Sequence, residues 1–406
     1  MKVFYGWRMV AAAAGIQLMH SGLLIQSFGA YVAVLSEQRG WSKTALAGAA
    51  AMQSLEGVLL GPILGWLIDR FGSRTLVQAG VVILGLGFMA LSQIETLPGF
   101  YGAVVTLAIG ASFCGYFPWT ITLVHWFQRQ RARALSTMTL GLAAGGLMVP
   151  LVAWTMQTYG WRPTAFGSGV LVILAGLPLA RVLRDKPADM GETLDGDQPL
   201  PEAAAGATPA TPPGRAFTVG EALRTRAFWL LGIGHGLALL VVTAVNVHAI
   251  SHMKEGLGYS LGEASIVITL MTVSQVGGLL LGAAVGDHWE KRHVAAACML
   301  AHMVALLLLT FATHPLMVGA FAVVHGAAWG LRGPFMQAIR ADYFGLRSIG
   351  MIMGLSAIII ALGQVAGPLV AGAFADWTGH YRVGFTVLAL AAGSGSLLFM
   401  LARKPV

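Results

Sequence analysis

Long uninterrupted apolar runs are the feature that most limits what this 406-residue chain can fold into. A helix that crosses a bilayer needs about 20 consecutive, mostly apolar residues, and inside hydrocarbon its backbone groups must be paired within the helix itself. Only 10% of the residues are charged and 56% are hydrophobic, whereas about a quarter are charged in an average soluble domain. The chain is therefore predicted to be an all-α protein embedded in a lipid bilayer.

Twelve stretches of the sequence are long and apolar enough to span a membrane. Pro98 and Pro315 lie where two of these stretches begin, and Gly72 and Gly345 lie in the short breaks, as expected at helix boundaries. The predicted spans are 8–35, 44–68, 75–93, 99–126, 134–158, 163–184, 227–252, 262–287, 293–312, 315–340, 349–374 and 381–402.

One long polar stretch separates the sixth and seventh predicted spans. Residues 185–220 are rich in Pro, Ala, Gly and acidic residues, a composition that predicts a flexible linker rather than a folded domain. The predicted organisation is therefore an N-terminal six-helix bundle (1–184), a cytoplasmic linker (185–222) and a C-terminal six-helix bundle (223–406).

The positions of the basic residues predict the orientation of the chain in the membrane, because Lys and Arg gather at the cytoplasmic ends of spanning helices. With the N-terminus inside, most of the 25 Lys and Arg residues fall in cytoplasmic loops, and Arg332 falls inside a span. The few external ones are Arg39, Lys43, Arg162, Lys254 and Arg382. We therefore expect both termini in the cytoplasm, and a monomer in a bacterial inner membrane. The net charge of +8 then needs no nucleic-acid partner.

The two halves of the sequence share landmarks at a nearly constant offset. Asp69 and Asp287 are 218 residues apart, and Pro118 and Pro334 are 216 apart. The other pairs are Arg74 with Arg292 (218), Phe127 with Phe344 (217) and Arg162 with Arg382 (220). Two parallel six-helix repeats are predicted, an arrangement that places a substrate site near the membrane midplane between the halves.

The loop GWLIDRFGSR at 65–74 resembles the signature loop of the major facilitator superfamily, and GAAVGDHWEKR at 282–292 resembles its second copy. The resemblance spans the whole chain and implies the fold of two pseudo-symmetric six-helix bundles and secondary transport rather than an enzyme. It also implies that these loops latch helix ends on the cytoplasmic side, where helix dipoles favour such charges. The expected gate residues are Asp69, Arg70, Arg74, Asp287, Lys291 and Arg292.

Two further segments are similar to monocarboxylate-transporter-like and oxalate/formate-antiporter-like members of that superfamily. They are YGWRMV at 5–10 and WFQRQRARA at 126–134. Many members of this group carry an arginine on the eighth helix that pairs with the substrate carboxylate. Residues 262–287 contain no basic residue, so another arginine must take that role if this chain binds a carboxylate.

Arg332 is the leading candidate, because a charge inside a spanning helix costs several kcal/mol unless it faces a cavity or a partner. His325, Trp329, Arg332 and Met336 lie on one face of the tenth predicted helix. A guanidinium suits bidentate binding of a carboxylate. Two interpretations stay open: contact with a substrate anion, or an inner gate in which Arg332 snorkels to the cytoplasmic surface or holds helix carbonyls.

Proton coupling has its own candidates. Glu56 is the only acidic residue well inside the first half, and an intramembrane carboxyl group can carry a proton; the alternative is a neutral carboxyl bonded to a neighbouring helix. Histidines can also titrate near neutral pH. The resemblance implies that the first, fourth, seventh and tenth helices line the cavity, which favours His20, His235 and His325 over His302, with packing roles as the alternative.

The remaining candidates are weaker. Gln17 shares a helix face with His20, Asn246 is polar within a span, and Tyr116 and Trp119 are the first-half counterparts of the Arg332 region. Aromatic packing is the alternative for the last two. Neither a metal site nor a cofactor is expected.

The sequence thus predicts a transporter that moves a small, monocarboxylate-like organic anion by alternating access, with proton coupling or exchange. One alternative is a proton-coupled exporter of drugs or other amphipathic compounds. That class carries a Gly-Pro pair in its fifth helix, and here only Pro150 is present. The other alternative is a non-transporting membrane sensor, which would usually bring a soluble domain longer than the linker or tails seen here.

Overall fold

The computed structural model describes residues 4–41, 60–196, 216–259 and 261–405. Within these ranges all regular secondary structure is helical, which confirms the all-α fold. Eleven helical segments are long and apolar enough to cross a membrane, and they correspond to eleven of the twelve predicted spans. The twelfth prediction, 44–68, falls largely on 42–59, outside the described residues, and residues 60–71 are helical.

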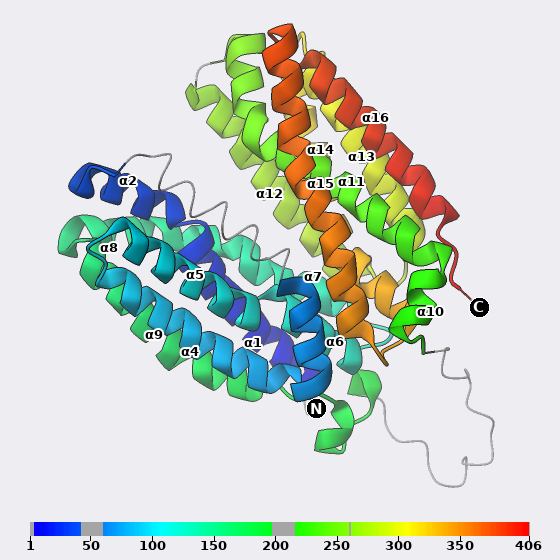
Figure 1. The fold of residues 1–406 in the computed structure, drawn as a ribbon. Helices are drawn as coiled ribbons and strands as arrows, with labels where there is room; N and C mark the ends of the chain where they lie inside the picture. The colour runs from blue at the N-terminus through cyan, green and yellow to red at the C-terminus, as the bar shows by residue number, and fades with distance from the viewer. Residues whose placement is uncertain (1–3, 42–59, 197–215, 260, 406) are drawn as a thin grey trace. The chain divides into compact units, whose positions relative to one another are not determined.

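The chain divides into two compact units, Met1–Pro212 and Pro213–Val406, coloured blue to green and green to red in Figure 1. Residues 60–71 apart, the helices of the first unit are α1 (Tyr5–Met19), η1 (His20–Ile25), α2 (Phe28–Arg39), α4 (Ser73–Ser92), α5 (Leu97–Cys114), α6 (Tyr116–Trp126), α7 (Arg131–Ala144), η2 (Gly145–Met148), α8 (Val149–Tyr159), α9 (Trp161–Val182), η3 (Pro187–Met190) and η4 (Leu194–Gly196).

Two predicted spans of the first unit are interrupted helices. The span predicted at 99–126 is divided into α5 and α6 at Gly115, whose backbone is extended. Pro118 follows three residues later and cannot donate a backbone hydrogen bond to the preceding turn. The span predicted at 134–158 is divided into α7 and α8 by the 3-10 turn η2, just before Pro150. In both spans a proline follows the break within three residues.

The second unit is built from longer helices. They are α10 (Val219–Arg224), α11 (Arg226–Ser251), η6 (His252–Gly256), α12 (Leu261–Val285), α13 (Lys291–Thr310), α14 (Pro315–Phe344), α15 (Ile349–Thr378) and α16 (Arg382–Leu401). The helices α14 and α15 continue through Pro334 and Pro368.

Corresponding helices pack in the same way inside each unit. In the first unit α1 packs on α7, and α4 packs on α5 and α9. In the second unit α11 packs on α15, and α13 packs on α14 and α16. The same internal pairing in both units is what two sequence repeats would produce.

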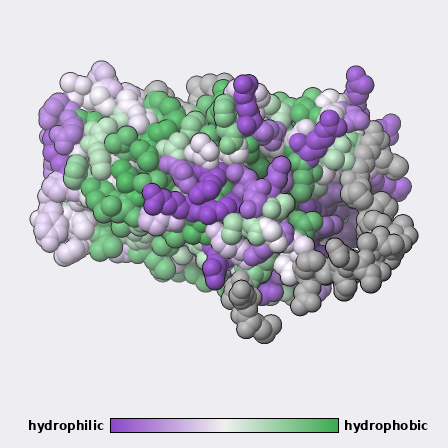
Figure 2. Space-filling model, turned by 90° about the horizontal axis from the view of Figure 1, so that it is seen from below, coloured by the Kyte–Doolittle hydropathy of each residue, from purple (hydrophilic) through white to green (hydrophobic). Residues whose placement is uncertain are grey.

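Large apolar side chains are exposed on both units. Leu147, Leu174, Leu316 and Trp377 are each at least 70% exposed, and Figure 2 shows broad hydrophobic areas next to a group of hydrophilic side chains. In a soluble monomer, extended apolar patches of this kind are rare. Here they are the surface that lipid covers, as expected of an integral membrane protein.

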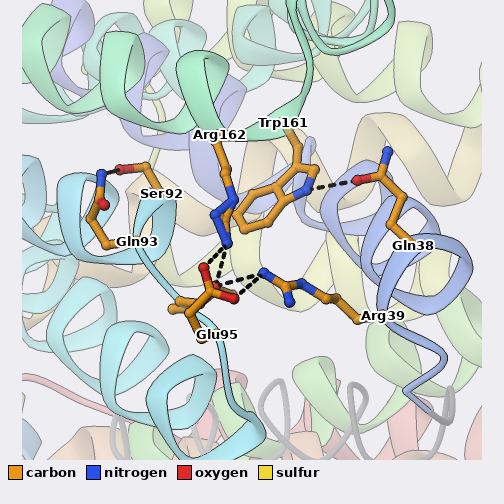
Figure 3. Close-up of polar contacts among 8 residues, drawn as sticks. Gln38, Arg39, Ser92, Gln93, Glu95, Trp161 and Arg162 are labelled. Atoms are coloured by element: carbon orange, nitrogen blue, oxygen red, sulfur yellow. Dashed lines mark hydrogen bonds and ion pairs between the residues drawn. The ribbon is translucent and has the colours of Figure 1, made fainter.

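An ion-pair cluster ties three helix ends together on the predicted external side of the first unit (Figure 3). Glu95, between α4 and α5, accepts hydrogen bonds from Arg39 at the end of α2 and from Arg162 at the start of α9. Both arginines also donate to the carbonyl of Ile94, and Trp161 donates to the side chain of Gln38. Two of the predicted external cations, Arg39 and Arg162, therefore have a structural role here.

Replacing Glu95 with Gln is expected to lower the thermal stability of the protein at neutral pH. The hydrogen bond from Arg39 lowers the pKa of the Glu95 carboxyl; some desolvation opposes this, and the charges of Arg162 and Arg39 reinforce it. The folded-state pKa thus lies below the ordinary value of 4.5. The stabilisation is therefore present above that value and is lost as the pH falls through the folded-state pKa.

Melting temperatures of the wild type and E95Q should accordingly differ at pH 7 and converge in acid. Glu255→Gln is the matched control, because Glu255 is exposed and also lies on the predicted external side. Equal melting temperatures of wild type and E95Q at pH 7 would contradict a stabilising role for the cluster.

Candidate functional site

Arg332 lies in α14 and is only 1% exposed. Among the residues that the structure describes, its Nε and NH1 atoms have no hydrogen-bond partner, and no carboxylate forms an ion pair with it. The groups within electrostatic range are His325 on the same helix, Cys298 and His302 on α13, and His235 on α11. The guanidinium is thus surrounded by imidazoles and a thiol rather than by acids.

His302 and His325 meet directly at the interface of α13 and α14. Their Nδ1 atoms are 3.1 Å apart, the ring centroids are 4.5 Å apart, and both side chains are fully buried. The resemblance favoured His325 over His302, because it implies that the tenth helix lines the cavity and the ninth does not. Cys298 and His302 are spaced i and i+4 on α13. This spacing was the sequence signal that α13 also has a face with polar side chains.

The sequence counts Arg340, the last residue of the predicted span 315–340, among the cytoplasmic Lys and Arg residues. The structure instead buries it inside the helix: α14 runs to Phe344, and Arg340 is 1% exposed. Its NH2 donates to Nδ1 of His235 at 3.2 Å, and its NH1 donates to the carbonyl of Met336 at 2.8 Å. Arg332, Met336 and Arg340 are spaced by four residues, which places them on one helix face. This spacing was the sequence signal that Arg340 continues the face of Arg332.

The contact with Arg340 also defines the state of His235. Because a guanidinium only donates, Nδ1 of His235 must present its lone pair, and the ring is neutral with hydrogen on Nε2. Of the other predicted residues in this unit, Trp329 is partly buried and packs against the hydrophobic core. Asn246 is exposed on α11.

In the first unit several predicted residues carry buried polar atoms without partners among the described residues. They are both amide atoms of Gln17, Nδ1 of His20 and Nε1 of Trp119. Gln17 and Trp119 are fully buried. His20 opens the π-helix η1, close to Gly115 at the start of α6. Tyr116 is partly buried at the start of α6.

Glu56, the proton-carrier candidate, lies outside the described residues. The structure therefore adds nothing on its surroundings.

The predicted gate residues of the first repeat lie around the N-terminus of α4. The Arg70 guanidinium stacks over Trp66 at 5.3 Å, and Asp69 is exposed. The backbone N–H groups of Ser73 and Arg74 both donate to the carboxylate of Asp185. Asp185, which follows α9, therefore caps α4, and Gly72 with a φ of 80° leaves room for that carboxylate.

The second repeat ties the N-terminus of α13 to the ends of two other helices. Lys291 forms a 3.0 Å ion pair with Asp342 near the end of α14. Arg292 pairs with Glu290 at 3.0 Å and donates to the carbonyl of Met400 on α16. Asp287 is partly buried in the preceding turn. Lys291 and Arg292 of the second repeat therefore hold helix ends inside their own unit.

The first part of the predicted linker packs against the first unit. Asp195 lies in η4 with a left-handed φ of 59°, and its side chain is 2% exposed. Its carboxylate accepts backbone hydrogen bonds from Gln128, Arg129 and Gln130, at the N-terminus of α7. An anion is favoured at this position by the helix dipole. Asp195 therefore connects the linker to α7.

Replacing Asp195 with Gly should lower the free energy of unfolding by about 1–2 kcal/mol, the usual size of a lost helix cap with its charge. Glycine accepts the left-handed backbone, so only the carboxylate is lost. Asp189→Ala is the control, because this exposed carboxylate accepts a single backbone hydrogen bond. Denaturant unfolding in detergent measures the stability of both variants. An unchanged unfolding midpoint for D195G would contradict a stabilising role of the Asp195 carboxylate.

Known proteins resemble this chain over nearly its whole length. A family profile described as Major Facilitator Superfamily matches residues 14–249 and 231–406. Monocarboxylate transporter 11 of Homo sapiens is 25% identical, covering 98% of this chain and 82% of the relative. The membrane sensor protein UhpC of Escherichia coli is 25% identical, covering 83% of this chain and 78% of the relative.

Solved structures show the same fold. The human organic anion transporter MFSD10 superposes with a TM-score of 0.68 at 15% identity, over 97% of this chain and 99% of that one. The proton:xylose symporter XylE superposes with a TM-score of 0.72 at 14% identity, over 99% of this chain and 96% of that one. At these identities the likeness concerns the fold alone.

Proposed function

Because this chain belongs to the major facilitator superfamily of secondary transporters, we propose that it moves a small, monocarboxylate-like organic anion across the bacterial inner membrane. It is an integral membrane transporter, not an enzyme, and no cofactor enters the proposal. Alternating access, with proton coupling or exchange, is the proposed mode of transport. Both termini are proposed to lie in the cytoplasm, as the distribution of Lys and Arg predicts.

The observation that best supports an anionic substrate is the burial of Arg332 without a carboxylate partner among the described residues. A buried charge without a partner is costly by several kcal/mol, and the described residues supply no carboxylate to Arg332. A substrate anion would remove that cost, with two unpartnered nitrogens of the guanidinium as donors. Arg332 is only 1% exposed, and its Nε and NH1 atoms bond to no helix carbonyl among the described residues. Both observations favour this role over snorkelling to the surface.

The other predicted residues take supporting roles in the proposal. His235, His325 and Trp329 lie on α11 and α14 of the second unit, and Asn246 lies further along α11. Gln17, His20, Tyr116 and Trp119 supply polar groups from the first unit. Glu56 and His20 remain the proposed proton carriers there, and Asp69, Arg70, Arg74, Asp287, Lys291 and Arg292 remain the proposed cytoplasmic gate.

Two other functions are weighed against this one. One alternative is a membrane sensor, because one relative is named a membrane sensor protein. A sensor would bind its ligand without net transport. A proton-coupled exporter of amphipathic compounds would often bind cations, and the buried guanidinium of Arg332 would repel a cation because like charges repel.

Purified protein in proteoliposomes tests the proposal. We expect radiolabelled lactate to exchange into vesicles loaded with unlabelled lactate, and small carboxylates to raise the melting temperature while sugars and cationic drugs do not. Stabilisation by lactate without exchange would instead identify a sensor. Stabilisation only by cationic drugs would favour the exporter.

A further inference from the structure

We propose that the His302–His325 pair is a proton-binding site whose occupancy is coupled to the anion at Arg332. The proposal rests on the proposed transport function and names a coupling site in the second unit. It starts from the contact between the two Nδ1 atoms, 3.1 Å apart in a fully buried interface.

A hydrogen bond between two Nδ1 atoms requires one ring to donate and the other to accept. In the neutral pair, the donor ring carries its only hydrogen on Nδ1 and therefore has a lone pair on Nε2. The acceptor ring carries its hydrogen on Nε2. Neither Nε2 atom has a hydrogen-bond partner among the described residues, and both are shielded from solvent. One buried basic nitrogen is thus left open in the neutral pair.

The pair can take up one proton at the open Nε2 atom. An N–H bond forms at the open Nε2, that ring becomes an imidazolium, and the Nδ1–H···Nδ1 hydrogen bond to the other ring is kept. The neutral partner stabilises the charge by accepting a charge-assisted hydrogen bond. The pair therefore gains one proton and one positive charge, and it loses both when the proton leaves.

The charged neighbours determine when this proton can bind. Arg332 acts electrostatically on both rings, and Cys298 and His235 lie around the same guanidinium. Arg340, buried on α14, adds a second positive charge beside His235. On α12, α15 and α16 charged residues lie toward the helix ends, as Glu263, Asp376 and Arg382 do. Repulsion from Arg332 therefore opposes protonation of the empty site.

An anion bound to Arg332 removes that repulsion. The cluster then holds one anion and one added proton without a change in its net charge, so the two are favoured together. Because coupling between two sites is reciprocal, the proton raises the affinity for the anion by the same factor that the anion raises the affinity for the proton. This makes the pair a device for moving one proton with each monoanion, in addition to any role of Glu56.

The test separates exchange from proton-driven accumulation, using lactate as the probe and vesicles loaded with the pH dye pyranine. His302→Gln keeps a polar side chain but cannot bind the proton. We expect H302Q to exchange lactate within about twofold of wild type, while uptake driven by a pH gradient falls about tenfold or more, in the usual range of coupling factors. Lactate-driven acidification of the lumen should fall in parallel.

His288→Gln is the matched control, because His288 is exposed in the turn after α12, and it should keep both activities. Wild-type rates of pH-driven uptake in H302Q would overturn the proposal. So would a parallel loss of exchange and pH-driven uptake in an H302Q protein that keeps the wild-type melting temperature. Failure of the wild type to exchange lactate would instead contradict the proposed function, so the two failures are distinct.

Discussion

Replacing Arg332 with Gln is expected to reduce lactate exchange strongly and at the same time to raise the melting temperature of the protein. Transport should fall by about 10- to 100-fold, because a charge-assisted hydrogen bond is worth about 1.5–3 kcal/mol and each 1.4 kcal/mol is tenfold in affinity. Stability should rise because glutamine removes a buried charge that has no carboxylate partner among the described residues.

This pair of opposite changes separates the two interpretations of Arg332. A gate residue that holds helix ends together would lose stability on substitution and would leave the affinity for lactate unchanged. Arg332→Lys should recover only part of the activity, because an ammonium lacks the bidentate fork. Arg347→Gln, in an exposed loop position of the same unit, is the control for loss of a basic residue. Full transport by R332Q would contradict the anion site.

Replacing Gly330 with Val is expected to prevent the second unit from folding. Gly326 and Gly330 lie on α14 where its backbone meets the backbone of α12, and an added Cβ at either position would collide with the carbonyl of Met271 or Gln275. Overpacking a core usually costs about 1–3 kcal/mol when side chains can move, and backbone atoms cannot give way as side chains do. Close approach through small residues is typical of membrane helix pairs.

Gly319→Val is the matched control, because Gly319 lies on the same helix with no atom near its added Cβ. We expect G319V to elute as a single species in size-exclusion chromatography with a melting temperature near that of wild type, and G330V to aggregate or to be absent. A folded, stable G330V protein would show that α12 and α14 can separate without loss of the fold.

Much of this molecule is predictable from local sequence. Apolar length determines the spans, since hydrocarbon admits few alternatives to a helix, and eleven of the twelve predicted spans are present among the described residues. The repeated loops around Asp69 and Asp287 identify the superfamily. Arg332 can be identified from the sequence as a charge within an apolar run. Such a charge is costly in a spanning helix and therefore indicates a functional site.

What the sequence could not supply is which face of one helix meets which face of another. Arg340 looked like a loop cation because hydropathy alone does not locate the end of a helix, and only the packing of α14 on α11 brings it to His235. Asp195 looked like part of a linker until the fold brought it to the N-terminus of α7.

The polar cluster of the second unit shows the same division. Periodicity along the chain places His325 and Arg332 on one face of a helix, and that much was determined by sequence alone. The contact of His302 with His325 depends on how α13 is rotated against α14, which is decided by close packing over the whole length of both helices. The apolar pattern thus determined that the chain spans a membrane, and tertiary packing decided which of its few polar groups meet.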